Sequence, residues 1–129
     1  MESKHISKIL KYTFLISGIA ALIFGFTFLF LTEIYLDLIG WIFYDPMVSR
    51  VLGAALIGLW VLQWLSFREA EWQNVKNVVI MMIVWHLVGG LACLISQFIF
   101  NLPIANWLHI IVLFLFLFAY ILSYYVEKK

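Results

Sequence analysis

A histidine lies within one of the most apolar stretches of this chain. His86 falls inside Val78–Phe100, a segment that is long enough to cross a bilayer. At a rise of about 1.5 Å per residue, the histidine is expected about 13 Å inside the hydrocarbon core. An ionisable side chain at that depth is a candidate ligand or proton carrier.

Helical spacing groups His86 with other small and polar residues. Intervals of three and four residues place one stripe on a single face of the helix, and its members are His86, Gly89, Gly90, Cys93, Ser96 and Gln97. Such a stripe is expected to face into a helix bundle, where Gln63 lies at a depth from which it can reach His86. A simpler alternative is a neutral histidine that bonds to a neighbouring helix and has no further function. We favour that alternative.

A second histidine raises the possibility of a haem held between two helices. His109 lies only a few residues inside its own apolar segment, however, so His86 and His109 are expected at levels that differ by about 15 Å. One haem iron cannot bind both side chains across that difference. No carboxylate shares these faces, so a dinuclear metal site is equally unsupported, and we predict no metal ligand and no resident cofactor.

An arginine near the opposite membrane surface suggests a different site. Arg50 is about one turn into its segment, near the level expected for Gln97 and His109. We predict that these three side chains line an outward-facing pocket for an anionic or carbonyl-bearing head group, of a lipid or a quinone. The simpler alternative is that Arg50 pairs with one of the loop carboxylates, which are Glu33, Asp37 and Asp45.

The composition places these residues in a membrane protein. The chain has 129 residues, of which 66% are hydrophobic and only 12% are charged, far from the balance of soluble domains. A net charge of +1 excludes a nucleic-acid-binding surface. Cys93 is the only cysteine, which excludes an intrachain disulfide.

Hydropathy predicts a single all-α integral membrane domain over residues 1–129, with four spanning helices. The expected spans are 12–31, 46–67, 78–100 and 107–125. Between the first two spans, Thr32–Asp45 carries carboxylates and aromatic rings that favour a short interfacial helix. The charged connection Arg68–Asn77 is expected outside the hydrocarbon, and Asn101–Asn106 forms a short turn.

The positive charges predict the orientation. Seven of the eight Lys and Arg residues fall in the two termini or in Arg68–Asn77, and Arg50 alone lies on the opposite side. The positive-inside rule then places both termini in the cytoplasm and the four-helix bundle in the plasma membrane.

Small residues mark the faces on which the helices are expected to pack. They lie in the first three spans, and the candidates are Gly18, Gly25, Ala54, Gly58, Gly89 and Gly90.

The order of segments resembles that of a known group of proteins. A lysine-rich start, an Arg-led segment at Arg50–Glu69 and a Gly-bearing third segment are similar to small uncharacterised four-helix prokaryotic membrane proteins, loosely DoxX-like. The resemblance implies a membrane subunit or quinol-facing module of a quinone-linked oxidation complex. It transfers no catalytic residue.

The expected function is therefore non-enzymatic, that of a subunit, accessory or scaffold protein of a membrane complex. Its expected partners are membrane lipids and another membrane protein or a second copy of the chain. One alternative is a lipid- or quinone-binding component of a membrane oxidoreductase. Another is a small transporter or proton pathway through His86 and Gln63, which lacks the paired ionisable residues of a relay.

Overall fold

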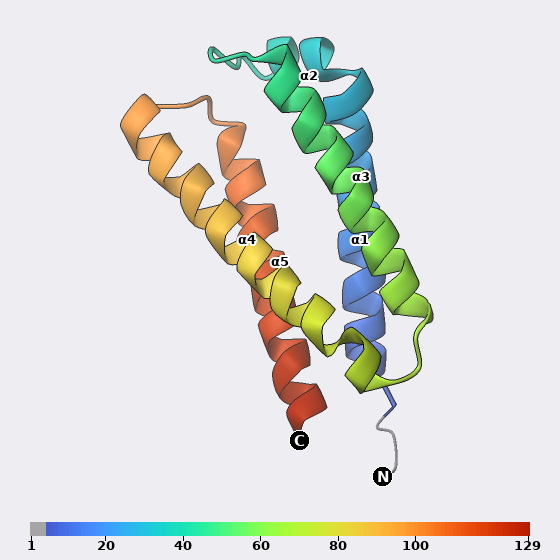
Figure 1. Cartoon of the computed structure of the whole chain (residues 1–129). Coiled ribbons are helices and arrows are strands. Elements are labelled where there is room, and N and C mark those ends of the chain that lie inside the picture. Colours follow the sequence, from blue (N-terminus) through green and yellow to red (C-terminus); the bar gives the residue numbers. More distant parts are fainter. Residues whose placement is uncertain (1–4) are drawn as a thin grey trace.

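The protein is built from helices. The computed structural model describes residues 5–129, and its helices are α1 (Lys8–Phe30), α2 (Thr32–Leu38), α3 (Pro46–Arg68), α4 (Trp72–Phe100) and α5 (Asn106–Lys128) (Figure 1). The four long helices have mean hydropathies of 1.6 to 2.5 and are each long and apolar enough to cross a membrane. The prediction of a helical protein with four helices that could span a membrane is confirmed.

Two of the long helices begin several residues before the predicted spans. α1 begins at Lys8, where Oγ of the preceding Ser7 accepts a hydrogen bond from the Leu10 amide at 3.2 Å. α4 begins at Trp72, and both Trp72 and Val75 are buried in the core. Apolar packing therefore extends α4 through most of Arg68–Asn77, the segment that its charges predicted to be a connection.

The segment between α1 and α3 is only half helical. α2 has seven residues and is followed by a turn at Gly40, whose φ of 69° favours glycine. α3 then begins as the sequence predicts, because Asp45 accepts a hydrogen bond from the Val48 amide at 2.9 Å and Pro46 occupies the first helical position.

The long helices form two closely packed pairs, α1 with α3 and α4 with α5. The backbones of α1 and α3 approach each other closely at Gly53. A Cβ atom added there would lie 2.6 Å from the Leu29 nitrogen and 2.8 Å from the Gly25 carbonyl oxygen. Sequence reasoning did not single out Gly53.

The predicted packing residues divide between contact and open faces. Gly18 and Gly25 face α3, while Gly89 and Gly90 face side chains of α5. Ala54 is exposed, and a Cβ atom added at Gly58 would meet nothing within 4 Å. These two residues of α3 therefore point away from the rest of the described chain.

The two pairs meet near the end of the molecule where α1 begins and α5 finishes, called here the terminal end. The core residues gather there, and they are Ile6, Leu10, Phe14, Trp72, Val75, Val79, Met82, Phe116 and Tyr120. Towards the opposite end, which carries α2, the pairs diverge (Figure 1). The chain is thus joined at the terminal end and splayed at the α2 end.

Candidate ligand cavity between the helix pairs

A half-open cavity of about 410 Å³ lies between the diverging pairs. Its walls come from all four long helices, with Leu36 and Trp41 added from α2 and the following loop. Most lining side chains are apolar, and none is Asp, Glu, Lys or Arg. The volume falls within the range of about 300–1,000 Å³ that is typical of small-molecule sites.

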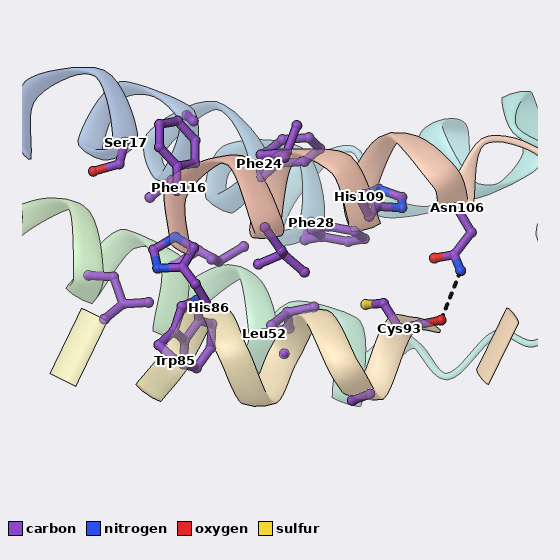
Figure 2. Close-up of a pocket in the computed structure, with 18 of the residues that line it drawn as sticks. Ser17, Phe24, Phe28, Leu52, Trp85, His86, Cys93, Asn106, His109 and Phe116 are labelled. Atoms are coloured by element: carbon purple, nitrogen blue, oxygen red, sulfur yellow. Dashed lines mark hydrogen bonds between the residues drawn. The ribbon is translucent and has the colours of Figure 1, made fainter. Parts of the chain in front are cut away.

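The cavity is elongated, with polar groups at its two ends. Figure 2 shows Ser17 and His86 at one end and His109 and Asn106 at the other. The rings of Phe24 and Phe28 lie between these ends, with Leu52. The site therefore has an apolar middle that separates two hydrogen-bonding regions.

A buried cluster of hydrogen bonds closes the terminal end. The Tyr120 hydroxyl lies 2.6 Å from Oγ of Ser17 and donates to Oε1 of Gln63 at 3.0 Å. Ser17 also hydrogen-bonds to Gln63 and donates to the Thr13 carbonyl at 2.6 Å. Tyr120, Ser17 and Gln63 are each at least 97% buried. The cluster joins α1, α3 and α5 across an apolar interior, where such bonds favour one arrangement of helices.

His86 lies beside this cluster and bonds within its own helix. Its Nδ1 atom is 2.6 Å from the Met82 carbonyl oxygen, and its ring centroid is 5.5 Å from that of Tyr120. No hydrogen bond joins His86 to Gln63 in residues 5–129. His86 and Gln63, which were expected to meet because of their similar depth, thus each contact Tyr120 instead of each other.

His109 connects the other end of the cavity to α2. Its Nε2 atom lies 2.7 Å from the Tyr35 hydroxyl, and its ring packs against Phe24, Phe28 and Trp41. Burial raises the pKa of Tyr35, which keeps this hydroxyl protonated. The contact positions α2 over the cavity.

Of Arg50, Gln97 and His109, only His109 lines this cavity. Arg50 instead forms an ion pair with Glu33 at 2.6 Å, and its side chain is 44% exposed and outside the cavity lining. A backbone hydrogen bond, together with side-chain bonds from Tyr44 and Arg50, lowers the pKa of Glu33. This pair is the simpler alternative proposed from the sequence, and it secures α2 to α3.

Gln97 is used in the turn between α4 and α5. Its Nε2 atom donates to the Leu102 carbonyl at 2.8 Å, while its Oε1 atom accepts from Asn106 at 2.9 Å. Asn106 also donates to the Cys93 carbonyl at 3.2 Å. Arg50 and Gln97 thus each find partners close to their own helix ends, and the outer pocket that they were predicted to form with His109 stays a prediction.

The two histidines line the same cavity but face different surroundings at its ends. Within residues 5–129, no group of three or more His, Cys, Asp or Glu side chains is close enough to hold a metal ion. The chemistry available in this cavity is apolar contact along its length, with hydrogen bonding at either end.

Tyr120 and Ser17 are the site residues that sequence reasoning missed. Each carries a hydroxyl inside an apolar span, and such a hydroxyl usually bonds to a neighbouring helix. A hydroxyl in an apolar span therefore indicated a contact between helices, but it did not identify the residue on the other helix.

Comparison of the chain with protein-family models, curated proteins and solved structures finds no match. The resemblance to DoxX-like proteins therefore stays an expectation.

Proposed function

We propose that this protein is an integral membrane protein that takes an uncharged, largely apolar molecule from the bilayer into the cavity between its helix pairs. The observation that carries the proposal is the cavity itself, about 410 Å³ in size and without a formal charge in its lining. Burying an ionic head group there without a counter-charge would be costly, whereas an apolar molecule would gain contacts along the site.

A route into the cavity from the bilayer supports this function. α3 and α4 make few contacts with each other, and they diverge towards the α2 end (Figure 1). Both helices contribute to the cavity lining, through Leu52 and Leu56 on α3 and through Trp85 and Gly89 on α4. A molecule dissolved in the bilayer therefore enters sideways, without crossing a charged surface. Quinones belong to this broad class, so a quinone is one candidate occupant.

Purification in a mild detergent followed by native mass spectrometry tests the proposal. We expect the lone protein to retain one small lipophilic molecule. The variant Ala92→Phe places a ring in the cavity wall and should lose that molecule. The matched control Ala54→Phe adds the same ring on the exposed face of α3 and should keep it. Equal retention by both variants would show that the molecule binds elsewhere, and a protein that retains nothing would refute the proposal.

We also propose that both termini face the cytoplasm. Six of the Lys and Arg residues in the described chain lie at or near the terminal end, and they are Lys8, Lys11, Arg68, Lys76, Lys128 and Lys129. Arg50 is at the α2 end. The surplus supports the cytoplasmic assignment, which puts α2 at the external surface. A membrane-impermeant maleimide applied to intact cells should label Ile42→Cys and should not label Lys128→Cys, and the reverse pattern would invert the topology.

A subunit or accessory role in a membrane complex is the second candidate. It is favoured by the outward position of Ala54 and Gly58, a small-xxx-small pair that no helix of the described chain covers. A second membrane helix, from another protein or another copy of this chain, can approach closely there. Under this function, Gly58→Leu should abolish a co-purifying membrane protein while Gly89→Leu, on a different helix, should not. Retention of the partner by Gly58→Leu would exclude this face.

A further inference from the structure

One ring nitrogen at the terminal end of the cavity is a hydrogen-bond acceptor that has no partner among residues 5–129. Nδ1 of His86 lies 2.6 Å from the Met82 carbonyl oxygen, and because a carbonyl can only accept, Nδ1 must carry the proton. In the neutral ring, Nε2 then has a free lone pair. The cavity lining contains no carboxylate that would stabilise a charged ring.

Nothing in residues 5–129 satisfies that lone pair. His86 is 95% buried and lines the cavity, and its hydrogen bond to Met82 is the only one it makes within the described chain. A ring nitrogen without a protein partner, on a buried side chain that lines a cavity, is a place for a ligand's hydrogen-bond donor.

The side-chain amide of Gln63 has an unused end in the same region. One end of this amide contacts both Ser17 and Tyr120, so the other end has no hydrogen-bond partner among the described residues. Gln63 is 99% buried and lines the cavity. His86 and Gln63 both contact Tyr120, the first through its ring and the second through its hydroxyl. The unused acceptor and the unused amide end therefore both belong to residues that contact Tyr120 at the terminal end of the cavity.

We propose that the ligand carries a hydroxyl group, which donates a hydrogen bond to Nε2 of His86 and contacts the free end of the Gln63 amide. Its apolar body then extends past Phe24, Phe28 and Leu52 towards the α2 end. The ligand class is a long-chain alcohol, of the fatty or isoprenoid type. A ligand whose only polar group is a carbonyl or an ether oxygen has no proton to give to His86, so it binds less tightly.

This inference rests on the proposed function, and the test separates the two. Dodecanol and dodecyl methyl ether share an apolar chain and an oxygen atom, but only the alcohol has a proton to donate. Their binding to the whole protein in detergent is measured by native mass spectrometry and by the shift in melting temperature. Affinities are expressed per mole fraction in the micelle, because the two probes partition differently. We expect the alcohol to bind on the order of tenfold more tightly, the effect of one satisfied hydrogen bond.

Histidine variants inside and outside the cavity locate the hydroxyl group. His86→Phe removes the acceptor and should bring the two affinities together. His86→Gln again offers a polar side chain near Nε2 and should restore part of the preference. The matched control His5→Phe makes the same change at an exposed residue outside the cavity lining and should keep the preference for the alcohol.

Each outcome decides the matter. Equal affinity of the wild-type protein for the two probes would overturn the hydroxyl assignment and leave the lipophilic-ligand function standing. Binding of neither probe would overturn both proposals. A preference for the alcohol that persists in His86→Phe would show that His86 does not accept the hydrogen bond from the hydroxyl group. The comparison of probes on the wild-type protein holds even if a variant fails to fold.

Discussion

The hydroxyl of Tyr120 on α5 lies 2.6 Å from Oγ of Ser17 on α1, where the two helix pairs meet. A second contact, between Thr13 and Ser123 at 3.2 Å, joins the same two helices. Hydrogen bonds thus hold the terminal end closed while the α2 end diverges around the cavity.

The first prediction concerns that contact. Tyr120→Phe keeps the ring but removes the hydroxyl that bonds to Ser17 and Gln63. We expect it to lower the free energy of unfolding by about 1 kcal/mol, in the range of hydrogen bonds between membrane helices. Denaturant unfolding in micelles measures the change. Tyr125→Phe, at a residue that is 63% exposed, should leave stability unaltered, and an equal loss in both variants would contradict the cluster's role.

The second prediction compares two glycines of α3. Gly53→Ala places a Cβ atom within 3 Å of three backbone atoms of α1, and it should destabilise the protein by about 2–3 kcal/mol because the helices must separate. Gly58→Ala meets no atom within 4 Å and should be neutral or stabilising by up to about 1 kcal/mol, since alanine favours the helix. Melting temperatures of the two variants test the expected order. The reverse order would mean that α3 presents a different face to α1.

The third prediction is a dependence on pH. The pKa of Glu33 is lower in the folded protein, through a backbone hydrogen bond and the bonds from Tyr44 and Arg50. A lowered folded pKa contributes stability that is present above the unfolded value, about 4.3 for Glu, and is lost as the pH falls through the folded value. The melting temperature should therefore fall in acid below about pH 4.3.

Glu33→Gln should remove part of this dependence on pH. Because both side chains of the ion pair are about half exposed, we expect a small effect that weakens further in high salt. Asp37→Asn on the same helix is the matched control, since Asp37 has no side-chain partner in residues 5–129. If Asp37→Asn, and not Glu33→Gln, reduces the dependence of the melting temperature on pH, the Glu33 ion pair does not act in this pH range.

The fourth prediction separates the turn from the ligand site. Gln97→Leu removes both side-chain bonds that Gln97 makes at the α4–α5 turn, to Leu102 and to Asn106. It should cost about 1–2 kcal/mol of stability because Asn106 also loses a partner. The variant should still retain the bound small molecule in native mass spectra, and Arg50→Ala should retain it too, since neither residue lines the cavity. Loss of the molecule in both variants would restore the outer pocket that the sequence predicted.

The sequence by itself determined the fold class and the presence of four long helices. Four apolar runs of bilayer length imply four helices, because a backbone in lipid must satisfy its hydrogen bonds within each segment. The start of α3 was equally readable, since Asp45 and Pro46 act on the adjacent turn. These effects depend on residues that are close together in the chain, so the sequence pattern predicts them.

Only the tertiary structure decided which helices pair and what lies between them. Gly53 and Gly58 are similar in the sequence, yet one lies against α1 and the other is uncovered, because the difference depends on the rotation of α3 against a distant segment. Arg50 and Gln97 were expected beside His109 from depth alone, but depth does not specify direction around a helix axis. The cavity likewise results from core packing that is concentrated at the terminal end, a balance of contacts between residues far apart in the chain.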